Sequence, residues 1–302
     1  MQQAPYLEQG STIGIVCPSG YLQKDRIEHA IRVLQQWGFH LKVGKAVGSA
    51  HHYFAGTDEE RKEDLQEMLD DPTIDAILMG RGGYGLSRII DDIDFAAFKN
   101  KPKWICGFSD VTVLHSHIQS QLNIATLHSP MCIAFKTGTE DTEHIRNFHD
   151  ALVGKALSYN ITASGHNRPG TATGIMTGGN LSLLAHLTGS VSEVSTDGKI
   201  LFIEDTGEYL YNIDRLMLHL KRAGKLDNLA ALLVGNFDNM KDGERPFRQS
   251  IEEIVLDKVK GYDYPVCFNF PAGHTEVNFT LTFGIKHKLT VDTTGGRLEL
   301  MR

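Results

Sequence analysis

Short runs rich in apolar residues alternate with amphipathic segments through the first half of the chain. The runs are expected to be strands and occupy residues 12–17, 40–44, 76–79 and 104–107. Between them, apolar residues recur at the helical period over residues 24–37 and 57–70, and they do so again over 111–121. Strands that alternate with helices favour parallel pairing with crossover helices. The pattern therefore predicts an open α/β sheet.

Local signals also mark the ends of the predicted helices. Gly38 follows the helix expected over 24–37, at a position where glycine commonly ends a helix. Thr57 precedes the next helix and Glu60 comes three residues later, which is the spacing of a capping box. These signals support the helical interpretation of both segments independently of their hydrophobic period.

The alternation weakens over residues 159–173, where Gly, Asn, Pro and Ser cluster. This composition is typical of a loop, so we place a domain boundary there, between a first domain over 1–163 and a second over 173–302. The second half resumes the alternation, and its tail predicts a hairpin around the turn 294–296. Its other strands are expected at 174–177, 200–203 and 231–234, and its helices at 180–187, 213–223 and 249–260.

A predicted strand, tight turn and helix meet in residues 104–112 (WICGFSDVT), with Ser109 at the bend. A serine there would point out of the sheet, beside backbone N–H groups at the positive end of the helix dipole. This arrangement suits a nucleophile and resembles a nucleophile elbow, although the G-x-S-x-G pattern is absent because residue 111 is Val. The alternative is that Ser109 is a helix N-cap, a position that serine favours.

The neighbouring strand runs into a glycine-rich segment, residues 80–85 (GRGGYG). The segment matches neither the dinucleotide-binding nor the P-loop pattern. A backbone N–H of Gly82 or Gly83 could join that of Asp110 in an oxyanion hole, or the segment could be a plain tight turn. Arg81 is a candidate for binding a carboxylate, and the alternative is a structural arginine.

Two further stretches supply candidate acid–base residues. The strand at 200–203 is followed directly by Glu204 and Asp205. Asp205 is expected to do no more than cap the next helix, whereas Glu204 is available to orient a histidine. Of the 14 histidines, His274 stands apart because it follows Gly273 in a loop between apolar strands. The alternative is a histidine with only a local bonding role.

Composition excludes several classes of function. A net charge of −7, with no Lys/Arg block, disfavours a nucleic-acid partner. The four cysteines show no C-x-x-C spacing and the histidines show no ligand spacing, so we expect free buried thiols, a reducing compartment, and no metal or cofactor. We see no signal peptide and no apolar run of membrane-spanning length. These features predict a cytoplasmic protein without a membrane partner.

Five segments, in their order along the chain, resemble the LD-carboxypeptidase family (serine peptidase family S66). This family includes murein tetrapeptide carboxypeptidases and microcin C self-immunity peptidases, and the likeness spans essentially the whole chain. The segments are residues 80–85, 107–110, 178–181, 203–205 and 273–274. One departure is the stretch 128–131 (HSPM), where the family more usually has Gly before the Pro; it touches no catalytic role.

The resemblance implies a flavodoxin-like or amidotransferase-like first domain and a smaller C-terminal α/β domain, with the active site in the cleft between them. It also implies a Ser–Glu–His triad, which maps onto Ser109, Glu204 and His274. The nucleophile would then come from the first domain and the other two residues from the second. Tyr84 and Asn180, within the matching segments, are expected to bind substrate together with Arg81.

The substrate implied by the resemblance is an L,D-peptide bond, typically the one that releases terminal D-alanine from a murein tetrapeptide during cell-wall recycling. We also expect a homodimer. Two rival hypotheses remain open. One is hydrolysis of a peptidyl-nucleotide antibiotic, which is disfavoured because only Trp37 and Trp104 could supply a large stacking surface. The other is a non-catalytic two-domain ligand-binding protein.

Overall fold

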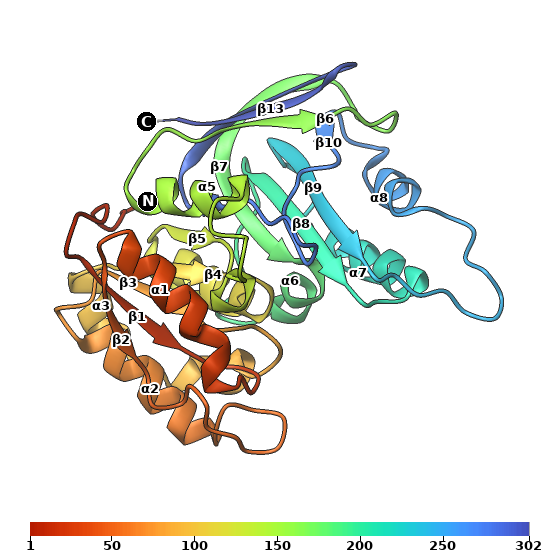
Figure 1. The fold of residues 1–302 in the computed structure, drawn as a ribbon. Helices are drawn as coiled ribbons and strands as arrows, with labels where there is room; N and C mark the ends of the chain where they lie inside the picture. Colours follow the sequence, from red (N-terminus) through yellow and green to blue (C-terminus); the bar gives the residue numbers. More distant parts are fainter. Residues whose placement is uncertain (302) are drawn as a thin grey trace. The chain divides into compact units, whose positions relative to one another are not determined.

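The computed structural model describes residues 1–301, which form two compact units. Unit 1 comprises Met1–Ala156 and Phe279–Thr282, and unit 2 comprises Leu157–Asn278 and the chain from Phe283 onward. The domain limits expected from the sequence, 1–163 and 173–302, stay a prediction. Each unit has its own sheet (Figure 1).

Unit 1 contains a six-stranded sheet in the order β11-β5-β4-β3-β1-β2. The pairs from β2 through β1, β3 and β4 to β5 are all parallel. The order 2-1-3-4-5 is that of flavodoxin-like sheets, so the predicted fold class is confirmed. The strands are β1 (Thr12–Val16), β2 (His40–Val43), β3 (Ala76–Met79), β4 (Trp104–Gly107), β5 (Thr126–His128) and β11 (Leu281–Phe283).

Helices and short helical turns connect these strands. The expected capping box is confirmed, because the Glu60 N–H bonds the Thr57 hydroxyl at 3.2 Å and the Thr57 N–H bonds Glu60 Oε2 at 2.7 Å. The α-helices are α1 (Glu28–Gln36), α2 (Asp58–Asp70), α3 (Ala96–Asn100), α4 (Thr112–His117) and α5 (Glu143–Leu152). The shorter turns are η1 (Lys24–Ile27), η2 (Leu86–Arg88), η3 (Ile90–Asp92), η4 (Ser109–Val111), η5 (Ile118–Leu122) and η6 (Cys132–Ala134).

Unit 2 contains a seven-stranded sheet in the order β10-β9-β8-β7-β12-β13-β6. The long strand β7 joins two kinds of pairing: residues 176–180 pair in parallel with β8, and residues 170–175 pair antiparallel with β12. The strands are β6 (Ser158–Thr162), β7 (Gly170–Asn180), β8 (Ile200–Thr206), β9 (Ala231–Asp238), β10 (Val266–Cys267), β12 (Lys286–Asp292) and β13 (Gly295–Leu300). The helices are α6 (Leu181–Leu187), α7 (Leu210–Arg222) and α8 (Ile251–Val259).

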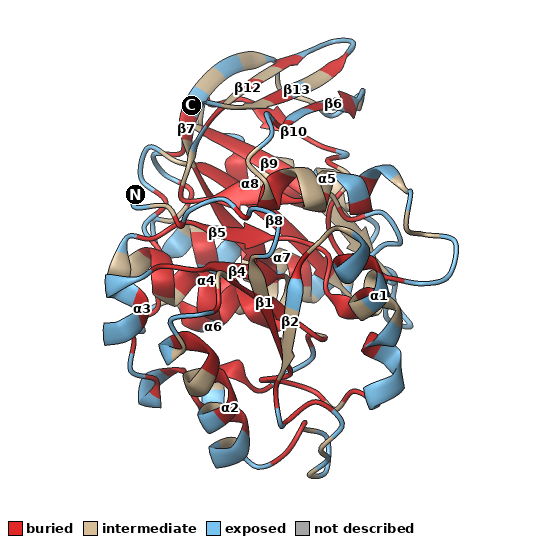
Figure 2. Ribbon diagram, turned by 60° about the vertical axis from the view of Figure 1, so that its left-hand side comes forward, coloured by how far each residue is buried: buried red, intermediate tan, exposed pale blue. Residues whose placement is uncertain are grey.

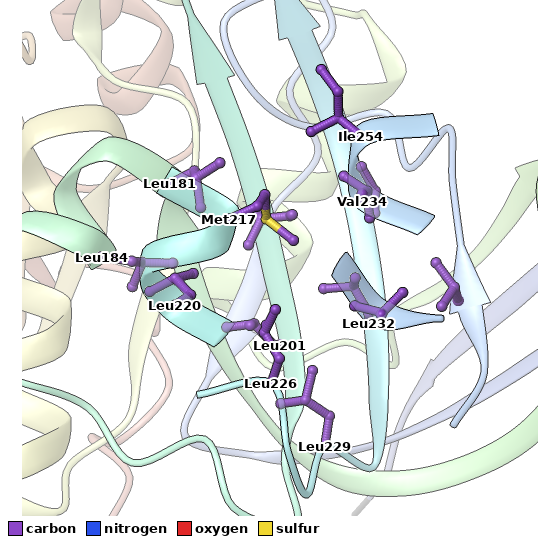
Figure 3. Packing of buried hydrophobic residues seen from close by; sticks show 14 of the residues in the cluster. Leu181, Leu184, Leu201, Met217, Leu220, Leu226, Leu229, Leu232, Val234 and Ile254 are labelled. Atoms are coloured by element: carbon purple, nitrogen blue, oxygen red, sulfur yellow. The ribbon is translucent and has the colours of Figure 1, made fainter. Parts of the chain in front are cut away.

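The core of unit 2 fixes the parallel strands that carry its candidate residues. Leu181, Met217 and Ile254, from α6, α7 and α8 respectively, pack with Leu201 of β8 and Leu232 of β9 (Figure 3). All five side chains are buried, and each such burial stabilises the fold by about 1.5–3 kcal/mol. This apolar layer therefore holds β8 and β9 in place, and with them the residues at their carboxyl ends.

Residues 159–173 are not the plain loop that their composition suggests, because they include most of β6 and the start of β7. In β6, Tyr159 and Ile161 are buried while their neighbours are exposed. An edge strand of this kind keeps polar residues on its outer face, which makes it resemble a loop in composition. The strand β5 and the helix α5 also lie outside the expected elements.

Burial differs between the centre and the edge of the sheet in unit 1. The strands β4 and β5 are buried throughout, whereas the edge strand β2 is only partly covered (Figure 2). Among residues 1–301, no helix is long and apolar enough to cross a membrane.

Candidate active site

Ser109 lies on a sharp turn between β4 and α4. Its φ is +65°, in the left-handed region that costs a non-glycine residue roughly 1–2 kcal/mol. The cap position of the helical turn is Phe108, and Ser109 already belongs to the turn Ser109–Val111. The N-cap alternative for Ser109 is therefore wrong. A serine on a strained strand-to-helix turn is the backbone arrangement of a nucleophile elbow.

The turn is held from behind by residues of β4 and α4. Gly107 has a φ of +156°, and a Cβ placed on it would lie 3.0 Å from both Met79 Cγ and Val111 Cγ2, so only glycine fits. The ring Nε2 of His115 lies 2.9 Å from the Gly107 carbonyl oxygen. Burial lowers the pKa of His115 to about 4. The imidazole is therefore neutral at pH 7, with Nε2 as the donor that fixes this carbonyl.

The glycine segment after β3 lies directly beside the serine. A Cβ placed on Gly82 would lie 3.0 Å from Ser109 Cβ and 3.1 Å from Ser109 Oγ. The N–H groups of Gly82 and Gly83 donate no hydrogen bond to any residue within 1–301. Because β3 and β4 are parallel neighbours, the segments after their carboxyl ends bring Gly82 and Ser109, both predicted site residues, close together. Ligands in open α/β sheets bind at this end of the strands.

The side chain of Asp110 connects three loops at this edge of the sheet. It is buried, and its Oδ2 accepts hydrogen bonds from Ser19 Oγ at 2.6 Å and from the Leu86 N–H at 2.9 Å. The buried Arg61 adds to this framework by donating to the carbonyls of Pro18 and Gly85. From the sequence, only the backbone N–H of Asp110 was predicted to have a role, and this supporting network was missed.

The two other predicted substrate-binding residues of unit 1 lie on the same segment. Arg81 donates from Nη1 to the Tyr21 carbonyl at 2.9 Å and from Nε to the Gly82 carbonyl at 3.3 Å. Tyr84 is 48% exposed and packs near Phe54, with ring centroids 5.9 Å apart. Two donors of Arg81 are thus used inside the loops, and substrate binding by either residue stays a prediction.

In unit 2, Glu204 and His274 form a close pair. His274 Nδ1 lies 2.6 Å from Glu204 Oε2; the Glu204 side chain is completely buried and that of His274 is 19% exposed. The register of the sheet shifts here, since Ile203 pairs with Val234 but Asp205 pairs with Phe237, which gives β9 one extra residue. Such a bulge redirects side chains and is common beside active sites.

The pair has coupled electrostatics. Burial raises the pKa of Glu204, and the hydrogen bond with His274 acts against this rise. Burial alone would lower the pKa of His274, but the hydrogen bond and negative charge of Glu204 outweigh it and raise the pKa above the ordinary value. A histidine in this setting can hold a proton near neutral pH and return it, as a general base and acid must.

The loop that carries His274 is shaped by the residue before it. Gly273 has a φ of +135°, and a Cβ placed on it would lie 3.1 Å from Glu204 Oε2. The Gly273 N–H donates to the side-chain oxygen of the buried Asn278 at 3.0 Å. On the other side of His274, the Thr275 hydroxyl accepts a hydrogen bond from Asn236 Nδ2 at 2.6 Å. A side chain at residue 273 would strain this backbone and crowd the Glu204 carboxylate that His274 contacts, so the position favours glycine.

Asp205 points to a different neighbour from Glu204. Its Oδ2 accepts from the N–H and hydroxyl of Ser182 at 2.9 and 2.7 Å, at the start of α6. Asp205 thus caps α6, the helix that precedes β8. The expectation that it caps the following helix, α7, is wrong. Burial raises its pKa, although these hydrogen bonds act against the rise.

Asn180 is the N-cap of α6. Its Nδ2 donates to Asp205 Oδ1 at 3.0 Å, and its Oδ1 accepts from the Leu183 N–H at 3.2 Å. A further hydrogen bond from Asn180 lowers the pKa of Glu204 against the effect of burial. These contacts favour a positioning role, and the expected contact with substrate stays a prediction.

Unit 1 thus brings together Ser109, Gly82, Gly83 and Asp110, and unit 2 brings together Glu204, His274 and Asn180. Within residues 1–301 there is no group of three or more His, Cys, Asp or Glu side chains that could hold a metal ion. Sequence reasoning missed the supporting roles of Ser19, His115 and Asn278. A local sequence signal for them is absent, because each acts on a partner brought near by the fold.

Known proteins resemble this chain over most of its length. The LD-carboxypeptidase N-terminal domain model matches residues 13–129, and the C-terminal domain model matches residues 173–289. A probable murein peptide carboxypeptidase of Bacillus subtilis is 34% identical over 284 residues, which cover 93% of this chain and 89% of that protein.

Solved structures are similar over almost the whole chain. Muramoyltetrapeptide carboxypeptidase from Oxalobacter formigenes superposes with a TM-score of 0.88 at 27% identity, covering 96% of this chain and 99% of the other. The microcin C7 self-immunity protein MccF, in complex with aspartyl sulfamoyl adenosine, superposes with a TM-score of 0.87 at 25% identity, covering 99% and 98%.

Proposed function

Because this chain belongs to the LD-carboxypeptidase family and is a serine carboxypeptidase, we propose that Ser109, Glu204 and His274 are its catalytic triad. The observation that carries the proposal is the 2.6 Å contact between His274 Nδ1 and the buried Glu204. The strained turn at Ser109 supports it from unit 1.

The proposed mechanism begins with attack of Ser109 Oγ on the carbonyl carbon of the scissile peptide bond. Because His274 Nδ1 donates its hydrogen bond to Glu204, Nε2 is the nitrogen that takes the serine proton. His274 then gives this proton to the leaving amine, and the carbon–nitrogen bond breaks. Water, deprotonated by the same imidazole, releases the acyl group and restores the serine hydroxyl.

The oxyanion formed on attack needs backbone donors. We assign this role to the N–H of Asp110 and to that of Gly82 or Gly83, since Gly82 lies against Ser109. Each such donor typically contributes about 3–4 kcal/mol to transition-state stabilisation. The charge of Glu204 stabilises the imidazolium at the same moment.

The proposed substrate is a murein tetrapeptide, from which the enzyme would release terminal D-alanine. The support is the similarity to two proteins named for murein or muramoyl peptides. We further propose that the protein acts as a cytoplasmic homodimer in peptidoglycan recycling. Light scattering of the purified protein and fractionation of cells would test these last two points.

The deciding experiment is D-alanine release from a murein tetrapeptide by the wild type and by Ser109→Ala. We expect the variant to lose activity by on the order of 10³-fold or more while its unfolding midpoint is retained. Ser195→Ala, at an exposed position in unit 2, is the matched control and should be fully active. Normal turnover by Ser109→Ala would disprove the triad.

A second candidate substrate is a peptidyl-nucleotide conjugate, favoured by the structural similarity to MccF. Stacking of the nucleobase of such a conjugate on a tryptophan has little support. Trp104 is completely buried, and Trp37 packs against His149 with ring centroids 4.8 Å apart. Assaying both substrates with the same preparation would rank them. Faster cleavage of the nucleotide conjugate than of the murein tetrapeptide would make the conjugate the preferred substrate.

A further inference from the structure

A tyrosine outside the predicted site residues lies beside the glycine segment of unit 1. Tyr53 belongs to a tight turn in which the N–H of His51 bonds the Phe54 carbonyl and the N–H of Phe54 bonds the His51 carbonyl, each at 3.0 Å. The Tyr21 N–H bonds the Tyr53 carbonyl at 3.0 Å, and Gly20 pairs with Phe54. The turn is thereby attached to the loop that follows β1.

The hydroxyl of Tyr53 lies against the backbone of Gly83. A Cβ placed on Gly83 would lie 2.8 Å from Tyr53 Oη. The preceding residue, Gly82, is the one whose added Cβ would lie 3.1 Å from Ser109 Oγ. Tyr53 Oη and Ser109 Oγ thus lie against neighbouring residues of the glycine segment, Gly83 and Gly82 respectively.

The ring of Tyr53 is supported from behind. It packs edge-to-face on Phe54, with centroids 5.5 Å apart and planes at 87°. The guanidinium carbons of Arg61 and Arg88 lie 4.8 and 5.3 Å from the centroid of the Phe54 ring. Tyr53 is still 53% exposed, and its hydroxyl makes no hydrogen bond to another residue within 1–301. A positioned donor is therefore open to a ligand.

A carboxypeptidase must recognise the free carboxylate at the end of its substrate. In a peptide only the amide nitrogen and one Cα separate this carboxylate from the scissile carbonyl, so the carboxylate lies about one residue's length from the carbon that the nucleophile attacks. Tyr53 Oη supplies a donor in this neighbourhood, because it lies against Gly83, the residue after the glycine that contacts Ser109. Arg81 directs two of its donors to the carbonyls of Tyr21 and Gly82 instead.

On the basis of the proposed function, we propose that Tyr53 Oη donates a hydrogen bond to the terminal carboxylate of the substrate. A phenol that donates to a carboxylate makes a charge-assisted bond, which is stronger than one between neutral groups. Tyr53 is thus a substrate-binding residue that makes the enzyme select chain ends. It takes no part in proton transfer.

The test compares two substrates, a murein tetrapeptide with a free terminal carboxylate and the same peptide ending in D-alaninamide. Each is assayed with the wild type, with Tyr53→Phe and with Tyr6→Phe, at enzyme concentrations high enough to follow both. Tyr6 is a matched control because it is also exposed but stacks on Trp104, the first residue of β4, at the opposite end of that strand from Ser109.

We expect Tyr53→Phe to lower kcat/KM for the free acid by about 10- to 100-fold, mainly through KM, and to change kcat/KM for the amide by less than about 2-fold. Tyr6→Phe should change neither. An equal loss on both peptides, or no loss on the free acid, would overturn the assignment. Failure of the wild type to release D-alanine would instead overturn the proposed function, and this inference with it.

Discussion

His274 Nδ1 lies 2.6 Å from Oε2 of Glu204, a carboxylate that is completely buried. The carboxylate therefore has little solvent to stabilise its charge and depends on the imidazole and on Asn180. The imidazole in turn is fixed in the tautomer with a proton on Nδ1. This relationship makes the pair a single acid–base unit, and several of its consequences can be measured.

Replacing Glu204 by Gln keeps the shape of the side chain and removes its charge. We expect kcat for D-alanine release to fall by on the order of 10³-fold or more, because the imidazolium formed during attack is no longer stabilised. Glu252→Gln, at the start of α8, removes a charge from the same unit and should leave kcat unchanged. An active Glu204→Gln enzyme would mean that the carboxylate has only a structural role.

The activity should depend on the protonation of His274. Its pKa is raised above 6.5, and the base must be deprotonated, so kcat/KM should rise with pH and reach half its maximum above pH 6.5. Burial alone lowers this pKa, and Glu204→Gln removes the charge that opposes burial. The acid limb of the variant should therefore move to lower pH. If the acid limb of the pH profile stays at the same pH in the variant, a group other than His274 is responsible for it.

Adding one methyl group at Gly82 should disturb the nucleophile with little effect on folding. The new Cβ would lie 3.0 Å from Ser109 Cβ, closer than ordinary contact, while the backbone of Gly82 has no left-handed conformation to strain. We expect Gly82→Ala to lower kcat/KM by about 10- to 100-fold. Gly165→Ala, where nothing lies within 4 Å, is the control. Equal unfolding midpoints would separate the steric effect from instability.

Asp110 should matter for stability as well as for catalysis. Its buried Oδ2 accepts bonds from Ser19 and from the Leu86 N–H, and Asp110→Ala would leave both donors without this acceptor. We expect the free energy of unfolding to fall by about 1–3 kcal/mol. Denaturant titration measures this directly, with the exposed Asp25→Ala as control. A change below about 0.5 kcal/mol would show that the three loops are held by other contacts.

The elements that the sequence predicts well are those with a strong local pattern. The strand 76–79 is observed at those residues, and the Thr57 capping box needs only residues three positions apart. The strand β6 was missed because only Tyr159 and Ile161 face the core. Its pairing with β13 depends on residues far along the chain.

The candidate site also combines features that a local sequence pattern predicts with features that depend on distant residues. Ser109, Glu204 and His274 each follow a recognisable motif, and so they could be proposed without a structure. The contact of Glu204 with His274 spans 70 positions, and the bulge between β8 and β9 that accompanies it depends on strand register. The hydrogen bond from His115 to Gly107 depends on how α4 packs back on β4. No local pattern encodes these relationships.

The left-handed backbone at Ser109 carries a wider consequence. Glycine adopts a φ of +65° without the steric penalty that serine has there, so the backbone alone would favour glycine at this position. The chain keeps a residue that strains the turn, and about 1–2 kcal/mol of folding free energy is given up to do so. Thermostability and reactivity are thus opposed at this single residue. Selection for a more stable protein, without selection for activity, would be expected to remove the nucleophile.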